Sequence, residues 1–130
     1  MKPIKLKIKT KTQVYSIIIG SNLVSNILKL SINNSVNFKK CLLIIDKNIS
    51  KKIVNKIKKT LINKKLYTHF FKASEINKNQ NNINKILNIL LIKNFSREDC
   101  LISIGGGITG DISSFAASLF KRGMKFVNVP

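Results

Sequence analysis

Four glycines and an acidic residue lie within one short stretch of the chain, Gly105 to Asp111. Gly105, Gly107 and Gly110 match the pattern G-x-G-x-x-G, which binds diphosphates when it follows a strand and opens a helix. Without a Cβ atom the backbone can approach a phosphate closely, and the free N–H groups of the first helical turn point at the anion. The stretch therefore predicts a phosphate-binding turn. A glycine-rich turn that holds no ligand is the alternative.

Three of the five carboxylates follow segments that we expect to be strands, and these are Asp46, Glu75 and Asp111. In open α/β sheets, ligands bind beyond the carboxyl ends of the strands, where a carboxylate can accept hydrogen bonds from ribose or substrate hydroxyls. The alternative for Asp46 is a turn residue or a helix N-cap. For Glu75 and Asp111 it is an acid in a first helical turn. Glu98 and Asp99 are predicted to form a solvated turn.

The ordinary dinucleotide pattern also needs an acid about 20 residues after the glycines. Residues 125–130 read Lys-Phe-Val-Asn-Val-Pro and contain none, so the simple version of the pattern fails. His69 is the only histidine and lies within a strand pattern, so we expect it to be structural. A metal site needs three or four ligands. The sequence shows no such spacing, and we assign no metal ligand to this chain.

The charge of the chain is strongly positive, with a formal net charge of +19. A basic surface suggests nucleic acid, but Arg97 and Arg122 are the only arginines among the 24 basic residues. Arginine is the residue that binds guanine edges and phosphates with two parallel hydrogen bonds. The excess of Lys, Ile and Asn is more typical of an AT-rich coding bias. A basic module that binds nucleic acid through its charge stays open as the alternative, and anionic small molecules are attracted in either case.

The two cysteines, Cys41 and Cys100, each open an apolar run and are expected to be small buried core residues with reduced thiols. No apolar run approaches the roughly 20 residues that span a bilayer. The N-terminus alternates lysine with apolar residues and lacks the apolar core of a signal peptide. We therefore expect a cytoplasmic protein that contacts no membrane.

The elements that position these residues follow from hydrophobic periodicity. The chain begins with a predicted hairpin of residues 4–8 and 14–20, followed by a helix over 23–30 that Ser21 caps. Continuous apolar runs of the kind found in buried parallel strands then alternate with helical patterns. The predicted strands cover 41–46, 66–71, 100–104 and 125–129, and the predicted helices cover 49–57, 75–95 and the segment that ends at a Gly123 C-cap. This order predicts an α/β fold with a parallel sheet.

The segment from Gly105 to Pro130 resembles the glycine-rich segment of the 3-dehydroquinate synthase family. In that family a GGGxxGD element leads into a helix with a Phe-Ala-Ala stretch, and an Arg-Gly turn and a strand ending in Val-Pro follow. This sequence has Phe115-Ala116-Ala117, Arg122-Gly123 and Val129-Pro130. Upstream, Glu75 to Lys78 resembles the family's Gly-Glu-x-x-Lys element, although Ser74 replaces the glycine. Residues 44–48 resemble its Asp-x-Asn at a strand end, and residues 15–24 resemble its N-terminal strand and helix start.

The resemblance implies a parallel-sheet, Rossmann-like NAD-binding domain over residues 1–130, with an N-terminal β-hairpin. The family continues into a helical domain that holds a divalent metal, zinc or cobalt, through one Glu and two His. We therefore expect this chain to be an amino-terminal part of a longer protein. The implied reaction converts 3-deoxy-D-arabino-heptulosonate 7-phosphate into 3-dehydroquinate in the shikimate pathway. It proceeds by NAD-assisted oxidation, phosphate elimination, reduction and ring closure, and it makes the enzyme a lyase that acts on a sugar phosphate.

The resemblance also implies a role for each matching residue. Asp46 and Asn48 would contact the adenosine part of NAD. Glu75 and Lys78 would contact the cofactor, Glu75 through ribose hydroxyls. Asp111 would approach the nicotinamide end as the catalytic residue. Gly106, Gly107 and Ile108 would line the diphosphate.

Other functions stay open at this point. Related sugar phosphate cyclases share these motifs, and dehydrogenases of the glycerol dehydrogenase type share the domain plan. A non-catalytic remnant that only pairs with a partner subunit is a further alternative. The full-length form is expected to be a homodimer, with no specific nucleic acid partner.

Overall fold

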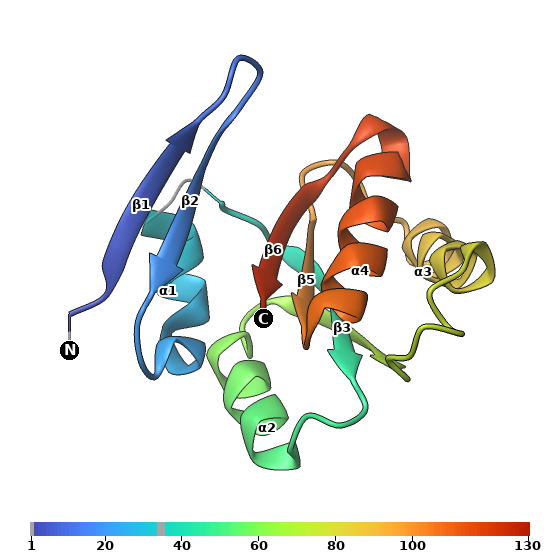
Figure 1. Cartoon of the computed structure of the whole chain (residues 1–130), viewed down its shortest axis with the longest axis horizontal. Coiled ribbons are helices and arrows are strands. Elements are labelled where there is room, and N and C mark those ends of the chain that lie inside the picture. The colour runs from blue at the N-terminus through green and yellow to red at the C-terminus, as the bar shows by residue number, and fades with distance from the viewer. Residues whose placement is uncertain (1, 34–35) are drawn as a thin grey trace.

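The computed structural model describes residues 2–33 and 36–130. A four-stranded parallel sheet carries helices on both faces, and a two-stranded antiparallel hairpin precedes it (Figure 1). The strands are β1 (Ile4–Lys9), β2 (Val14–Ile19), β3 (Lys40–Asp46), β4 (Lys65–Phe71), β5 (Cys100–Ile104) and β6 (Lys125–Val129). The helices are α1 (Ile27–Asn33), α2 (Lys51–Thr60), α3 (Gln80–Ile92) and α4 (Gly107–Leu119), with short 3-10 helices at Leu23–Asn26 and Phe120–Arg122. The α/β prediction with an N-terminal hairpin is confirmed.

Strand β3 lies inside the sheet and is buried on both faces. Successive side chains of a strand point to opposite faces. Cys41, Leu43 and Ile45 accordingly pack in the core on the α2 side, while Leu42 and Ile44 pack in the core on the α3 and α4 side. All five are fully buried. The continuous apolar run in the sequence is therefore explained by helices that cover both faces of the sheet.

The order of strands in the sheet is β4-β3-β5-β6. From β3 the chain crosses over α2 to β4 on one side, whereas from β5 it crosses over α4 to β6 on the other side. The two connections therefore leave the neighbouring strands β3 and β5 toward opposite edges of the sheet. They also lie on opposite faces, because α2 and α4 belong to different cores. The reversal lies between β3 and β5, and the space beyond the carboxyl ends of these two strands, called the crevice below, is where ligands bind in open α/β sheets.

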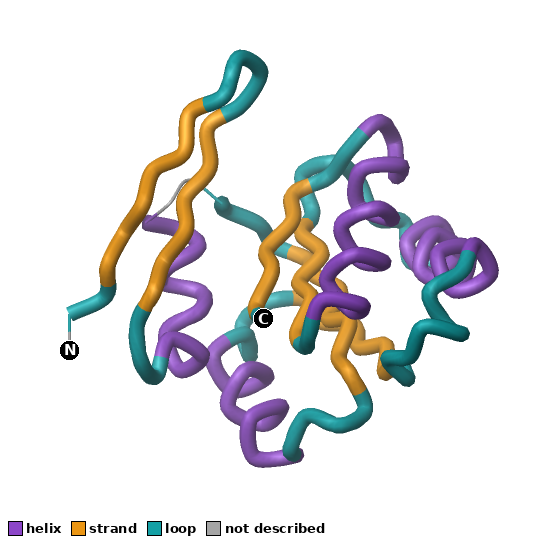
Figure 2. Tube along the Cα trace, viewed as in Figure 1, coloured by secondary structure: helices purple, strands orange, loops and turns teal. Residues whose placement is uncertain are grey.

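The hairpin forms a sheet of its own, set apart from the parallel sheet (Figure 2). The register pairs Ile4 with Ile19, Leu6 with Ile17 and Ile8 with Tyr15. Partners in an antiparallel ladder share a face, so these six residues form one apolar face. Five of the six are exposed and Ile8 is half-buried. The predicted hairpin is confirmed, but in the described part of the chain no element buries this face.

Several predicted helix ends differ from the structure, and three of them have a local explanation. Ser21 caps no helix, because the first turn is a 3-10 helix that begins at Leu23 after Asn22, whose backbone is left-handed. The third helix begins at Gln80 and not at Glu75, since the Asn79 side chain accepts a hydrogen bond from the backbone N–H of Asn82 and so caps it.

The end of the fourth helix also differs. Helix α4 ends at Leu119, and Lys121, Arg122 and Gly123 then adopt positive φ angles of 45°, 67° and 111°. These three successive residues, whose backbone φ angles are all positive, reverse the chain so that it enters β6. Gly123 therefore caps the short 3-10 helix that follows α4 and not α4 itself.

The second helix is confirmed, although the side it buries is shifted. Ser50 caps α2 through a hydrogen bond from the backbone N–H of Ile53. The buried residues are Val54 and Ile57, whereas Ile53 is exposed. Ile49, Ile53 and Ile57 are four residues apart in the sequence, and this spacing, on which the predicted helix over 49–57 rests, does not mark one buried stripe. Among the described residues, no helix is both long and apolar enough to span a membrane.

Truncating a buried side chain of α2 should destabilise the chain far more than truncating an exposed one nearby. Ile57 is fully buried and Ile62 is 76% exposed. We expect Ile57→Ala to lower the free energy of unfolding by about 2–5 kcal/mol, because it removes apolar burial and leaves a cavity. Ile62→Ala should change it by less than about 0.5 kcal/mol. Urea unfolding followed by circular dichroism measures both values, and equal losses would contradict the assigned core.

Candidate functional site

Gly105 follows β5 at the crevice and lies against Asp46, the last residue of β3. A Cβ atom on Gly105 would stand 2.9 Å from the Cβ of Asp46 and 3.0 Å from Oγ1 of Thr109, and its φ is +150°. Both the contact distances and the backbone conformation exclude a side chain here. The packing of the protein therefore accounts for this glycine, and the same packing brings Asp46 beside the glycine-rich turn.

In contrast to Gly105, Gly106 and Gly107 have free space where a side chain would be. A Cβ atom on either would have no protein atom within 4 Å, and both residues are exposed. Gly106 has φ −77° and ψ −167°, which any residue can adopt. Nothing in the described part of the chain requires a glycine at these two positions. Their missing side chains leave open space above the start of α4.

Helix α4 begins in this open space without a side-chain cap. Gly106 is its N-cap residue and supplies no side-chain hydrogen bond to the first turn. The first N–H groups of a helix have no partner within it, and together with the helix dipole they attract an anion. Thr109, in the first turn, is fully buried, and its hydroxyl oxygen has no hydrogen-bond partner among the described residues. The helix start is therefore a place where bound anionic oxygen atoms would meet unused donors.

The third glycine of the pattern serves packing between α4 and β6. A Cβ atom on Gly110 would lie 3.0 Å from Oδ1 of Asn128, and that oxygen also accepts a hydrogen bond of 2.6 Å from the hydroxyl of Ser103. Gly110 thus lets the helix approach the last strand closely. Sequence reasoning missed this contact, because Asn128 gave no signal beyond its place in a strand.

Asp46 ends β3 and shapes the turn that follows it. Its Oδ1 accepts a hydrogen bond of 3.0 Å from the backbone N–H of Asn48. Since Ser50 caps α2, Asp46 is a turn residue and not the N-cap that sequence allowed as an alternative. The carboxylate is half-buried and Asn48 is exposed. Asp46 is thus held at the crevice with one oxygen already engaged.

Lys78 and Asp111 come together from different elements of the fold. Lys78 lies in the loop after β4 and Asp111 lies in α4, and the ammonium donates to Oδ2 of Asp111 at 3.0 Å. Both side chains are largely solvent-exposed, at 42% and 62%. The hydrogen bond from the ammonium to Asp111 is the main reason that the pKa of Lys78 is raised above 10.5. Sequence reasoning assigned these residues separately and did not predict the pair.

The structure excludes the alternative that Asp111 and Glu75 are acids in a first helical turn. Helix α4 begins at Gly107, which places Asp111 in its second turn and not its first. Glu75 lies in a turn between β4 and α3, in which its backbone oxygen accepts a hydrogen bond from the N–H of Lys78. Neither acid therefore stabilises a first helical turn. Glu98 and Asp99 form the expected turn, in which Asp99 accepts from the backbone N–H of Ser96 and Glu98 pairs with Lys125 at 3.3 Å.

The family model described as 3-dehydroquinate synthase N-terminal matches residues 68–130. The chain is 57% identical over 127 residues to the 3-dehydroquinate synthase of Pelagibacter ubique (strain HTCC1062). The aligned residues make up 98% of this chain and 34% of that protein. It is also 38% identical over 131 residues to the 3-dehydroquinate synthase of Clostridium botulinum (strain Alaska E43 / Type E3). That alignment covers 97% of this chain and 36% of that protein. Almost the whole chain is related to the N-terminal part of 3-dehydroquinate synthases.

Solved structures agree with this relationship at the level of the fold. A 2-deoxy-scyllo-inosose synthase, crystallised with carbaglucose-6-phosphate, NAD+ and Co2+, superposes with a TM-score of 0.84 at 17% sequence identity. The match covers 98% of this chain and 35% of that protein. The chain thus spans about a third of the length of the relatives that it matches.

One departure from the 3-dehydroquinate synthase pattern has no structural cost. Ser74 stands where the family has glycine, but it is not among the described residues with a positive φ. Its hydroxyl oxygen accepts a hydrogen bond of 3.3 Å from the backbone N–H of Asn77. The turn that carries Glu75 and Lys78 therefore forms with serine in this position.

The remaining candidates for chemistry lie outside the crevice. Cys41 and Cys100 are free thiols buried in the core, and burial raises the pKa of Cys41 to about 12. They are register partners on β3 and β5. Among the described residues, no three His, Cys, Asp or Glu side chains form a group that could hold a metal ion. His69 is half-buried on β4, away from the glycine-rich turn.

Asp111→Asn should bring the pKa of Lys78 down toward 10.5, because it removes the carboxylate that accepts the ammonium's hydrogen bond. A raised lysine pKa stabilises the folded chain at pH values below 10.5, and this contribution is lost as the pH rises through the folded-state pKa. The variant should therefore lose this part of the pH dependence of unfolding. NMR titration of the lysine side-chain signals measures the shift.

The matched control is Glu98→Gln, which breaks the ion pair with Lys125 and should leave the pKa of Lys78 where it is. A pKa of Lys78 that stays the same in Asp111→Asn would show that the pair does not form in solution.

Proposed function

We propose that this chain binds NAD, with the diphosphate of the cofactor over Gly106 and Gly107. The observation that carries the proposal is the open space above these two glycines, which no contact within the described chain explains. A bound group that needs close approach to the backbone does explain it. The location supports the same proposal, since the turn lies at the crevice between β3 and β5 where the strand order reverses.

The residues present fit a dinucleotide diphosphate. The uncapped start of α4 offers N–H donors, the buried hydroxyl of Thr109 lacks a partner among the residues that the structure describes, and Ile108 is half-buried in the same turn. The acid that usually follows the glycines by about 20 residues is missing from the sequence. Asp46 supports the proposal in its place, because the parallel register of β3 and β5 puts it beside Gly105 in space.

We assign the individual roles as the resemblance implies them. Asp46 and Asn48 hold the adenosine part, and Glu75 accepts hydrogen bonds from ribose hydroxyls. Lys78 contacts the cofactor, and its ion pair with Asp111 holds it beside the second turn of α4. Asp111 reaches the nicotinamide end and is the catalytic residue of this chain.

We propose that the chain is the NAD-binding domain, residues 1–130, of a 3-dehydroquinate synthase. Bound NAD would supply the reversible removal of hydride from 3-deoxy-D-arabino-heptulosonate 7-phosphate. Oxidation makes the neighbouring C–H acidic, so that phosphate can leave before reduction and ring closure. Gly106 and Gly107 would hold the diphosphate and Asp46 the adenosine part, and the nicotinamide end would lie near Asp111. A catalytic zinc or cobalt, a homodimer and a cytoplasmic location stay predictions for the longer protein.

Gly106→Ala should separate binding from folding. The new methyl group meets no protein atom within 4 Å, so the free energy of unfolding should change by less than about 0.5 kcal/mol. The methyl group would occupy the space of the diphosphate, and the affinity for NAD should fall by at least about tenfold, which equals about 1.4 kcal/mol. Isothermal titration calorimetry measures the affinity. Ser118→Ala, at the exposed far end of α4, should leave both quantities unchanged, and unimpaired binding by Gly106→Ala would contradict the proposal.

A chimera tests the catalytic assignment. This chain would replace the matching N-terminal third of the Pelagibacter ubique 3-dehydroquinate synthase, and release of phosphate from 3-deoxy-D-arabino-heptulosonate 7-phosphate would be followed. We expect turnover by the chimera and a loss of roughly 100-fold or more in Asp111→Ala, because a charged group beside the reacting end is removed. Asp99→Ala is the matched control in a distant turn. A folded chimera without turnover, or normal turnover by Asp111→Ala, would refute the assignment.

A further inference from the structure

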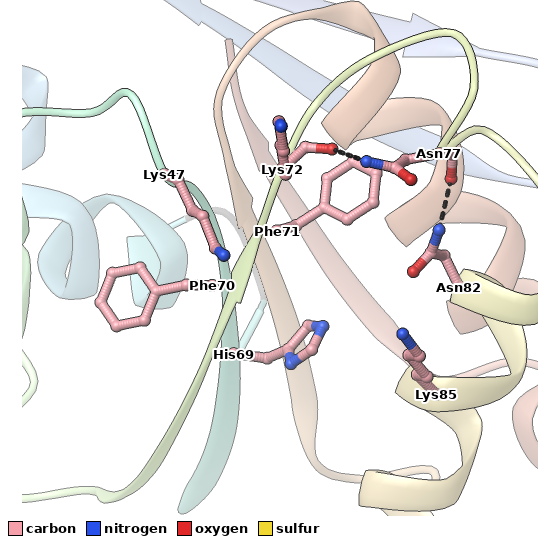
Figure 3. A pocket seen from close by; sticks show the side chains of 8 residues that line it. All are labelled: Lys47, His69, Phe70, Phe71, Lys72, Asn77, Asn82 and Lys85. Carbon is pink, nitrogen blue, oxygen red and sulfur yellow. Dashed lines mark hydrogen bonds between the residues drawn. The ribbon is translucent and has the colours of Figure 1, made fainter.

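A small cavity lies beside β4, the outer strand of the parallel sheet, on the side that α3 covers (Figure 3). Its volume is about 180 Å³, well above the roughly 10–15 Å³ that one water molecule needs. Its polar lining residues are Lys47, His69, Lys72, Asn77, Asn82 and Lys85. None of them is among the residues assigned to the dinucleotide, although Lys47 and Asn77 are next to such residues in the sequence.

The imidazole of His69 is the central polar group of this cavity. It is half-buried, and no hydrogen bond among the described residues involves its ring nitrogens. Figure 3 shows the Lys85 side chain pointing from α3 toward the ring. Burial, and then the positive charges of Lys85 and Lys47, hold the pKa of His69 below 6.5. The ring is therefore mostly neutral at pH 7 and keeps an unused donor and an unused acceptor.

The charges around the cavity are unbalanced. Lys47 after β3, Lys72 after β4 and Lys85 on α3 contribute three cations, and no carboxylate is among the described residues that line the cavity. The two ion pairs formed by described residues involve none of these lysines. Since like charges close to one another repel, the arrangement lacks an anion that would compensate them.

The wall opposite β4 is held in place by side-chain hydrogen bonds to the backbone. Asn77 Nδ2 donates to the carbonyl of Lys72 at 2.9 Å, and Asn82 Nδ2 donates to the carbonyl of Asn77 at 2.8 Å. Figure 3 shows both bonds. The loop after β4 and the first turns of α3 are thereby fixed to one another, so the cavity is built before any ligand enters.

We propose that this cavity binds a phosphate group, either inorganic phosphate or the phosphate of a phosphomonoester. A phosphate dianion accepts hydrogen bonds from ammonium groups and from an imidazole N–H, and its charge compensates the lysines. Binding it reverses the electrostatic effect on His69, which becomes easier to protonate. The half-buried ring, which has no hydrogen-bond partner in the described part of the chain, distinguishes this cluster from the many exposed lysines on the rest of the surface.

The test uses His69, the only histidine of the chain, as its own reporter. Its imidazole proton signal is followed by NMR against pH in increasing sodium phosphate, with sodium chloride at matched ionic strength as the reference. The reference is essential because salt alone screens the lysines and raises the pKa. We expect phosphate to raise the pKa of His69 by about 0.5–1 unit beyond chloride, in a saturable manner. A pKa that responds equally to phosphate and to chloride would overturn the proposal.

Two lysine variants separate a site from general charge. Lys85→Gln should weaken the phosphate response at least about fivefold, because it removes the lysine whose charge acts most strongly on the His69 ring. Lys56→Gln removes the same charge from an exposed position in α2 and should leave the apparent affinity within about twofold. Equal losses in the two variants would show that phosphate only screens the net charge, and the proposal would fail.

A second ligand distinguishes inorganic phosphate from a phosphomonoester as the group that the cavity binds. Glycerol 3-phosphate is titrated beside inorganic phosphate, and the tighter of the two identifies the source, while a response to neither overturns the proposal. The Gly106→Ala variant should keep the His69 response, because the cavity does not include the start of α4. Loss of the response in that variant would place the anion at α4 and contradict a separate site.

Discussion

Strands β3 and β5 are neighbours in the parallel sheet, and the chain leaves their carboxyl ends in opposite directions. Neither connection can cover the space between those ends, because each must reach its own side and its own face of the sheet. Because crossovers between parallel strands are right-handed, two connections that leave in opposite directions also lie on opposite faces of the sheet. What lies in the crevice is therefore decided by the last residue of each strand and by the start of α4.

The residues at these positions divide into those that the fold requires and those that it does not. Gly105 must be glycine, because Asp46 and Thr109 fill the space where its side chain would be. Gly110 must be small for α4 to approach Asn128. Gly106 meets no such demand, and neither does Gly107. The glycine-rich stretch thus combines glycines that pack the protein with glycines that leave room for something else, and only the second kind argues for a ligand.

Much of this architecture could be predicted from the sequence. The continuous apolar runs gave the two central strands, β3 and β5, since a strand covered on both faces has no polar side. The acids after the strands and the glycines after β5 pointed to the right edge of the sheet. The helix ends were less predictable, because Asn79 and Ser50 compete locally with neighbouring polar residues for the capping position.

Contacts between distant segments could not be predicted in the same way. The ion pair of Lys78 with Asp111 joins a loop after β4 to α4, and only the order of the strands brings the two together. His69 was expected to be structural on its strand pattern, and the cavity beside it depends on how α3 and its loop pack. Alternation in the hairpin marks which residues share a face, but it does not show whether another element covers that face. The apolar face of the hairpin is exposed in the described part of the chain.

Chemical-shift mapping of NAD binding tests the central claim most directly. The backbone amide signals of the isotope-labelled chain would be recorded during a titration with NAD. The account predicts that the largest changes fall on Gly105 to Ile108 and on the turn from Asp46 to Asn48, which flank the crevice. Changes centred on the hairpin or the far ends of the strands, with the amides of Gly106 and Gly107 unmoved at saturation, would contradict it.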